Sequence, residues 1–226
     1  MKLNRLTERI WVYHFEKERD RPNLSYIRGD RWSMTVDAGH SENHTRDFYQ
    51  ALEAEGLPLP ALTVLTHWHW DHTLGMHAVH GLCLANSRTN QLLADFRNRL
   101  ETEGTSFFFA MDETIRREYA DGQPVIATLA DLVFQGEMKV DAGNCPIHIF
   151  QAEAPHTDDS TLIYVPGEKV LILGDSTSGT FPEWTMDPGL AEKMVQTIQD
   201  VNPEICLHSH LEALPAKKLI REYLLQ

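Results

Sequence analysis

Short apolar runs separated by longer amphipathic stretches are the dominant pattern along this chain. Uninterrupted or alternating apolar runs predict strands, which we expect at residues 10–14, 24–28, 32–36, 61–65, 82–84, 138–140, 147–150 and 204–207. Apolar positions at helical spacing predict helices at residues 42–55, 73–79, 186–201 and 215–225. Two apolar runs, 162–165 and 170–173, flank Pro166-Gly167-Glu168-Lys169, and a tight turn there predicts a β-hairpin.

A further helical pattern runs from residue 87 to residue 121. The apolar positions that define its two helices are Leu92, Leu93, Phe96, Leu100, Ile115 and Tyr119. We expect this segment to be a helical cap insert within a single domain that spans residues 1–226. Because helices separate the strands in each half, the order of elements favours an α/β fold in which sheets pack together with helices outside.

Composition and charge exclude several classes of protein. The chain has 226 residues and a formal net charge of −13, which disfavours a nucleic-acid partner because an acidic surface repels phosphate. The segment 1–10 is charged and lacks the apolar core of a signal peptide, and no apolar run is long enough for a membrane span. The cysteines Cys83, Cys145 and Cys206 form no paired motif. We therefore expect a cytoplasmic protein with free thiols and no membrane partner.

Histidine is unusually frequent, with 12 residues, and several cluster in Thr66-His67-Trp68-His69-Trp70-Asp71-His72 directly after a predicted strand. Imidazole and carboxylate are ligands that zinc prefers. If the strand continues, His67 and His69 point to the same side and could hold one ion. Asp71 and His72 come where the strand gives way to a loop or helix, and they could reach a second ion beside the first.

This segment resembles the HxHxDH signature of the metallo-β-lactamase superfamily. That family also requires a third histidine, a bridging carboxylate and a last histidine, in that order. The matching residues are His156 before Thr157-Asp158-Asp159-Ser160, Asp175 in Gly174-Asp175-Ser176, and His210 after the last predicted strand. Asp37 in Val36-Asp37-Ala38-Gly39 matches an early strand-end aspartate of the family. The resemblance covers nearly the whole chain and implies a four-layer αββα sandwich of two mixed β-sheets with helices on the outer faces.

The resemblance further implies a dinuclear metal site. One ion would be held by His67, His69 and His156, the second by Asp71, His72 and His210, with Asp175 bridging the two. Two divalent ions are implied; zinc is expected, with manganese or iron as alternatives. Asp37 would orient the ligands without binding metal. His208 competes with His210 for the last position, and Ser209-His210 resembles the family's Gly-His pair better.

The implied chemistry is hydrolysis by a metal-bound hydroxide. Two ions about 3.5–4 Å apart lower the pKa of a shared water toward neutrality, and Asp71 would be the catalytic residue that holds the hydroxide and moves its proton. The sequence leaves open whether Phe107, Phe108, Phe109 and Trp184 line an apolar pocket or fill the core under the cap. If they line the pocket, a small ester, lactone, thioester or amide is the expected substrate.

Two functions from other classes compete with hydrolysis. Persulfide dioxygenases share the fold and motif but use one iron, whereas the complete ligand set here favours two metals. A non-catalytic metal-binding module would normally have lost ligands, and none is lost.

Within the family, several substrates are disfavoured. Asp175 and the expected absence of an export signal argue against a true β-lactamase, and Ser178 stands where many lactonases have tyrosine. The chain ends 16 residues after His210 (226 minus 210), so the helical glutathione-binding domain of glyoxalase II is not expected. The substrate, the native metal and the formation of a homodimer stay open.

Overall fold

Two β-sheets packed face to face form the centre of the molecule, which we describe from a computed structural model for residues 2–225. The first sheet has the order β1-β2-β3-β4-β5-β6-β7. Its strands are β1 Leu3–Arg5, β2 Ile10–Tyr13, β3 Leu24–Arg28, β4 Ser33–Val36, β5 Leu62–Val64, β6 Leu82–Asn86 and β7 Leu132–Phe134. The sheet is mixed, because β1 to β4 pair antiparallel whereas β4 to β7 pair parallel.

The second sheet has the order β13-β12-β11-β10-β9-β8 and is also mixed, with β11 and β12 parallel. Its strands are β8 Glu137–Asp141, β9 Pro146–Gln151, β10 Thr161–Val165, β11 Val170–Gly174, β12 Ile205–His208 and β13 Leu214–Pro215. The predicted hairpin is confirmed, since β10 and β11 pair antiparallel up to Val165 and Val170.

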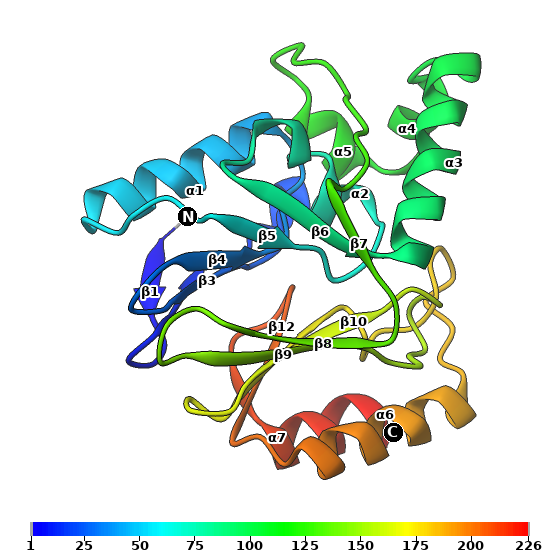
Figure 1. The fold of residues 1–226 in the computed structure, drawn as a ribbon. Coiled ribbons are helices and arrows are strands. Elements are labelled where there is room, and N and C mark those ends of the chain that lie inside the picture. The colour runs from blue at the N-terminus through cyan, green and yellow to red at the C-terminus, as the bar shows by residue number, and fades with distance from the viewer. Residues whose placement is uncertain (1, 226) are drawn as a thin grey trace.

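Helices cover the outer face of each sheet, which completes the four layers visible in Figure 1. The α-helices are α1 Glu42–Ala54, α2 Trp70–Thr73, α3 Ser87–Glu103, α4 Ser106–Met111, α5 Glu113–Glu118, α6 Pro188–Val201 and α7 Ala216–Leu219. Short turns of other helix types are η1 Lys17–Arg19, η2 Met76–Ala78 and η3 Ile220–Leu224. None of these helices, in the part of the chain that is described, is long and apolar enough to cross a membrane.

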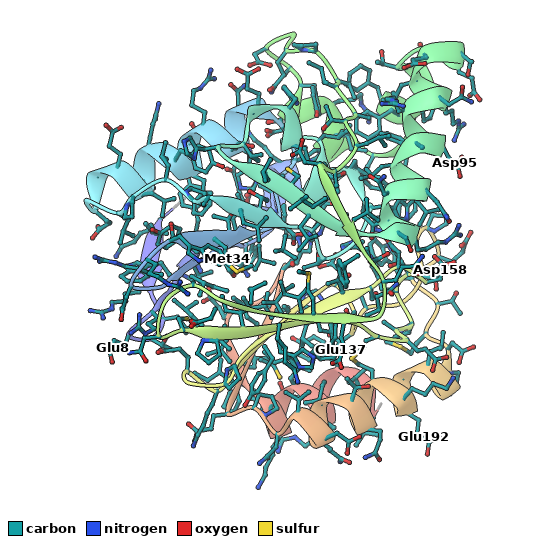
Figure 2. All side chains as sticks on the ribbon, viewed as in Figure 1. Glu8, Met34, Asp95, Glu137, Asp158 and Glu192 are labelled. Carbon is teal, nitrogen blue, oxygen red and sulfur yellow. The ribbon has the colours of Figure 1, made fainter. Side chains whose placement is uncertain are left out.

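Side-chain alternation explains why several strands read as continuous apolar runs. In β11, Val170 and Ile172 face the other sheet, whereas Leu171 and Leu173 pack beneath α6. Both faces of the strand are therefore buried, as expected for a sheet covered on each side. Met34, labelled in Figure 2, lies in the apolar layer between the two sheets.

Polar caps fix where the longer helices begin. Ser41 accepts a hydrogen bond from the backbone N–H of His44 at the start of α1, and Asn86 does the same for two N–H groups of α3. Asp187 caps α6, which has Pro188 in its first turn. These are the side chains that best satisfy the free N–H groups of a helix start.

Several predicted elements differ from the structure. Instead of the helix expected at 73–79, the structure has the short helix α2, which already begins at Trp70, followed by η2. The cap segment contains three helices where two were expected, because Ser106–Met111 forms the additional helix α4. Strands β1, β7 and β13 were not predicted, because two or three residues are too few to show a period.

We predict that the layer between the sheets supplies much of the stability, and β6 offers a matched pair to test it. Leu84 is 2% exposed in this layer, whereas Leu82 on the same strand is 48% exposed. Leu84→Ala should lower the free energy of unfolding by about 2–5 kcal/mol through lost burial and a cavity, and Leu82→Ala by about 0.5 kcal/mol or less. Urea unfolding measures both; equal losses would contradict the assignment of this core.

Candidate metal centre

Loops at one end of the two sheets carry the candidate ligands. His67 and His69 follow β5, and Asp71 and His72 form the first turn of α2. From the second sheet, the loop before β10 carries His156, the end of β11 leads into Asp175, and the loop after β12 carries His210. The expectation that His67 and His69 lie on the strand itself is wrong, because β5 already ends at Val64. Both sheets nevertheless contribute to a single site.

Three histidines form the first of two groups. Suitable atoms of His67, His69 and His156 all lie within 4.8 Å of one another, and all three side chains are buried. The His156 Nε2 atom lies 3.0 Å from the His69 Nδ1 atom. Two ring nitrogens that approach so closely can share a proton or face a common ion. Three converging imidazoles are a ligand set suited to zinc.

Hydrogen bonds on the far side of these rings fix which nitrogen faces the group. The Thr66 hydroxyl lies 2.9 Å from one carboxylate oxygen of Asp37 and donates to it, so it accepts from His67 Nδ1, at 3.1 Å. His156 Nδ1 lies 2.8 Å from the Gly179 carbonyl oxygen and must donate to it. The Nε2 atoms of His67 and His156 therefore keep their lone pairs for the centre of the group.

The second group combines two carboxylates and two histidines. Asp71 Oδ2 lies 3.1 Å from Nε2 of both His72 and His210. Asp175 Oδ2 lies 3.6 Å from His72 Nε2, 3.4 Å from His210 Nε2 and 3.8 Å from His156 Nε2. Asp175 Oδ2 therefore lies near histidine nitrogens of both groups, which is the position a bridging ligand requires.

Asp37 contacts the second group through Nδ1 of His72, the ring nitrogen that does not face Asp71. Its carboxylate lies 2.7 Å from His72 Nδ1 and accepts a further bond from the Thr66 backbone N–H at 2.8 Å. His72 Nε2 then faces Asp71, although the pair lacks the geometry of a hydrogen bond. The arrangement agrees with the predicted role of Asp37 in orienting a ligand.

The electrostatics of the two groups differ. Burial lowers the pKa of His69 to about 3, and it lowers the pKa of His67 well below its usual value. Burial also opposes charge on His72 and His210, but the neighbouring Asp71 and Asp175 raise the pKa of both well above the usual value. The first group thus offers neutral lone pairs, and the second favours positive charge, which a metal ion can supply.

The residues present fit a pair of metal ions. Three buried polar atoms, His67 Nε2, His72 Nε2 and Asp175 Oδ1, have no hydrogen-bond partner among the described residues. Buried polar atoms normally have a partner, so unpartnered atoms on members of both ligand groups suit bound ions. All seven predicted ligands are brought together in this way, and their binding of metal stays a prediction.

The structure also separates the two candidates for the last ligand. His208 Nδ1 accepts from the His210 backbone N–H at 3.0 Å, so its Nε2 carries a proton, which it can donate to Ser178 Oγ at 3.0 Å. Both nitrogens of His208 are thereby engaged, and burial lowers its pKa to about 4. His210 Nε2 instead faces Asp71 and Asp175. The geometry favours His210.

Gly174 lets the strand β11 deliver Asp175 to the site. Its φ of +58° lies in the left-handed region, and a Cβ atom there would come within 2.6 Å of the Thr66 Cβ. Only glycine accepts both conditions without displacing its neighbours. The end of β11 can therefore lie in direct contact with Thr66, the residue that precedes His67.

A cavity of about 290 Å³ opens directly onto the second group. Trp184 lines it, together with Trp70 and Phe181, whereas Phe107, Phe108 and Phe109 do not. Phe108 is fully buried, and all three phenylalanines pack against one another and the cap helices. The sequence left open whether these aromatic residues line a pocket or fill the core under the cap. In the structure, Trp184 lines the cavity, whereas the three phenylalanines belong to the core under the cap.

The sequence analysis missed Asp20, whose side chain also lines this cavity. Burial raises the pKa of Asp20 to about 6, with the charge of Asp71 as a further cause. Asp20 lies 50 residues before Trp70, the indole of which approaches its carboxylate. No sequence motif marks it, and its left-handed backbone, with a φ of 51° that aspartate tolerates, is evident only in the structure.

Comparison with solved structures shows the same architecture. The metallo-beta-lactamase from Pontibacter korlensis matches with a TM-score of 0.71 and 15% identity, over 98% of this chain and 99% of that one. The DIM-1 metallo-beta-lactamase matches with a TM-score of 0.69 and 16% identity, over 97% of this chain and 95% of that one. The sec-alkylsulfatase Pisa1 from Pseudomonas sp. matches with a TM-score of 0.71 and 16% identity, over 99% of this chain and 40% of that one. At these identities the likeness shows the fold.

No curated protein matches the chain. The family model described as the metallo-beta-lactamase superfamily matches residues 19–210, a segment that contains every residue of the two ligand groups. With the sandwich fold and the histidine and aspartate groups at its edge, this match shows that the chain belongs to the metallo-beta-lactamase superfamily.

Proposed function

We propose that the chain is a dinuclear metal-dependent hydrolase that acts on a small ester, lactone, thioester or amide. The observation that carries the proposal is the position of Asp175, whose Oδ2 lies within 3.8 Å of histidine nitrogens from both ligand groups. Two groups that share one carboxylate suit two neighbouring ions, with zinc expected and manganese or iron as alternatives.

The residues of the site have separable roles in this chemistry. Two divalent ions held there would act as Lewis acids and lower the pKa of a water molecule toward neutrality. Asp71 lines the cavity, and its carboxylate would accept and return a proton, while the oxygen that faces His72 and His210 would serve as the ligand atom. Trp70 and Phe181 line the same cavity and would limit the access of bulk water to this carboxylate.

Among residues 2–225, no cysteine or serine lines the cavity as a candidate nucleophile. Burial raises the pKa of Cys83 and Cys206 to about 12, and it also raises that of Cys145, so none is a thiolate near neutral pH. Among the described residues that line the cavity, Thr114 has the only aliphatic hydroxyl, and no histidine is hydrogen-bonded to it. Hydrolysis by an activated water therefore suits the site best.

The ester part of this proposal includes sulfate esters. One structural relative is an alkylsulfatase, whose chain is much longer than this one. Alkyl sulfates therefore belong in a substrate screen beside carboxylic esters, lactones, thioesters and amides.

We expect protein purified without added metal to contain about two zinc or manganese ions per chain. His67→Ala should lose metal, because it removes a buried ligand atom of the first group. His148→Ala serves as the control, since His148 pairs with Glu137 on the surface of the second sheet. Elemental analysis measures both. One iron per chain with oxygen uptake on a persulfide would overturn the hydrolase proposal in favour of a dioxygenase, and no metal would leave a non-catalytic module.

The last ligand can be identified by a second pair of variants. His210→Ala should reduce the content to about one ion, because the second group would lose a nitrogen that faces Asp71. His208→Ala should retain both ions, since the nitrogens of His208 are engaged elsewhere. Elemental analysis and circular dichroism together test this; the reverse pattern in two folded proteins would assign the ligand to His208.

Asp37→Asn should weaken metal affinity about 10- to 100-fold without removing a ligand, because His72 loses the carboxylate that orients it. Competition with a chromophoric chelator measures the affinity. Asp30→Asn is the matched control, because Asp30 is exposed and pairs only with Arg9 among the described residues. Equal affinities for wild type and Asp37→Asn would show that Asp37 has no part in the site.

A further inference from the structure

The cavity beside the second ligand group contains a carboxylate that the proposed reaction does not use. Asp20 lines this cavity from the loop after η1, together with the aromatic side chains of Phe181 and Trp184. Its carboxylate receives one long contact, 3.4 Å, from the indole Nε1–H of Trp70. A carboxylate has about four acceptor sites, so this single contact leaves most of them for a ligand in the cavity.

The nearest cationic side chains in the sequence are engaged elsewhere. Arg19 lies 3.5 Å from Glu16, and Arg21 donates two hydrogen bonds to the buried Glu118, at 2.7 and 2.8 Å. No ion pair found between residues 2 and 225 includes Asp20. Lys17 and His210 line the same cavity, but neither forms an ion pair with Asp20 among the described residues. Burying a carboxylate without a direct ion pair is costly, and a cation bound against it would relieve part of that cost.

The backbone around Asp20 is held rigidly. His40 Nδ1 lies 3.0 Å from the carbonyl oxygens of both Arg19 and Asp20, so it donates to them. The Arg21–Glu118 pair ties the next residue to helix α5. A carboxylate fixed in this way needs little further ordering to bind a ligand, which favours affinity.

Aromatic rings line part of the cavity. Phe181 lies edge to face with Trp70 and with Trp184, with ring centroids 5.2 and 5.7 Å apart. Trp184 is 58% exposed, so its ring is accessible to a ligand. Indole and phenyl rings attract cations with alkyl substituents through their π-electrons and their apolar surface.

We propose that this cavity selects substrates that carry an alkylammonium group, with Asp20 as its counter-ion and Phe181 and Trp184 as its apolar wall. The inference rests on the proposed function for the reaction, since the ammonium group would be the part of the substrate remote from the bond that is hydrolysed. Two charged residues stand at the rim of the cavity. Asp112 is occupied in capping α5, whereas Lys17 opposes a cation.

The experiment compares a cation with a neutral molecule of the same shape. Choline and 3,3-dimethylbutan-1-ol are titrated into the full-length, zinc-loaded protein at pH 7.5 and followed by calorimetry. Choline should bind at least about tenfold more tightly, since both an ion pair and cation–π contacts are available to it. Asp20→Asn should abolish this preference; asparagine tolerates the left-handed backbone at this position, so the loop should keep its shape.

Two control variants complete the test. Asp95→Asn removes an exposed charge on the outer helix α3 (labelled in Figure 2), at a residue that does not line the cavity, and should keep the preference. Lys17→Gln should strengthen choline binding a few-fold, because it removes the opposing charge. Equal binding of the two probes to wild type, or an unchanged preference in Asp20→Asn, would overturn the inference.

Metal content, measured on the same samples, separates the two proposals. Protein that holds two ions and hydrolyses esters but shows no preference for choline refutes the cation site alone. Protein that lacks metal yet prefers choline, with the preference lost in Asp20→Asn, refutes the hydrolase and retains the cation site.

Discussion

The hydrogen bonds of Asp37 are the constraint on which the ligand geometry depends. Its carboxylate accepts from the backbone and hydroxyl of Thr66 and from His72 Nδ1. Because the hydroxyl is committed to Asp37, it can only accept from His67. One buried carboxylate thus fixes the tautomers of two histidines in different ligand groups, and their Nε2 atoms face inward before any ion is present. Metal sites built in this way need little rearrangement to bind.

Much of the fold, and the set of residues that the fold brings together, was predictable because the relevant patterns follow one another in a fixed order along the chain. The segment from His67 to His72 carries its ligands within six residues, and the apolar strands that position Asp175 and His210 are long enough to show their period. The hairpin was predictable for the same reason, since a tight turn separates two apolar runs. Patterns of this kind can be recognised in the sequence because each is formed by residues that are close together along the chain.

Features that depend on contacts between distant segments were not predictable. Asp20 and Phe181 meet the ligands only because the loop after η1 and the loop after β11 fold over the same end of the sheets. The choice between His208 and His210 likewise depends on Ser178, which lies in a different loop. The phenylalanines of α4 read equally well as pocket or core, since an apolar run does not show what it packs against.

The contact of Gly174 with Thr66 has a consequence for how such a chain can change over time. Any side chain at position 174 would collide with the side chain of Thr66, so the residue at 66 limits what position 174 can hold. Thr66 also supplies the carbonyl that accepts from the Thr161 N–H, at 2.7 Å, and so joins the two sheets. Substitutions at these positions are therefore not independent. A change at one of these positions should be reversed or accompanied by a compensating change in the other sheet. Residues from the two halves of the sandwich should therefore vary together.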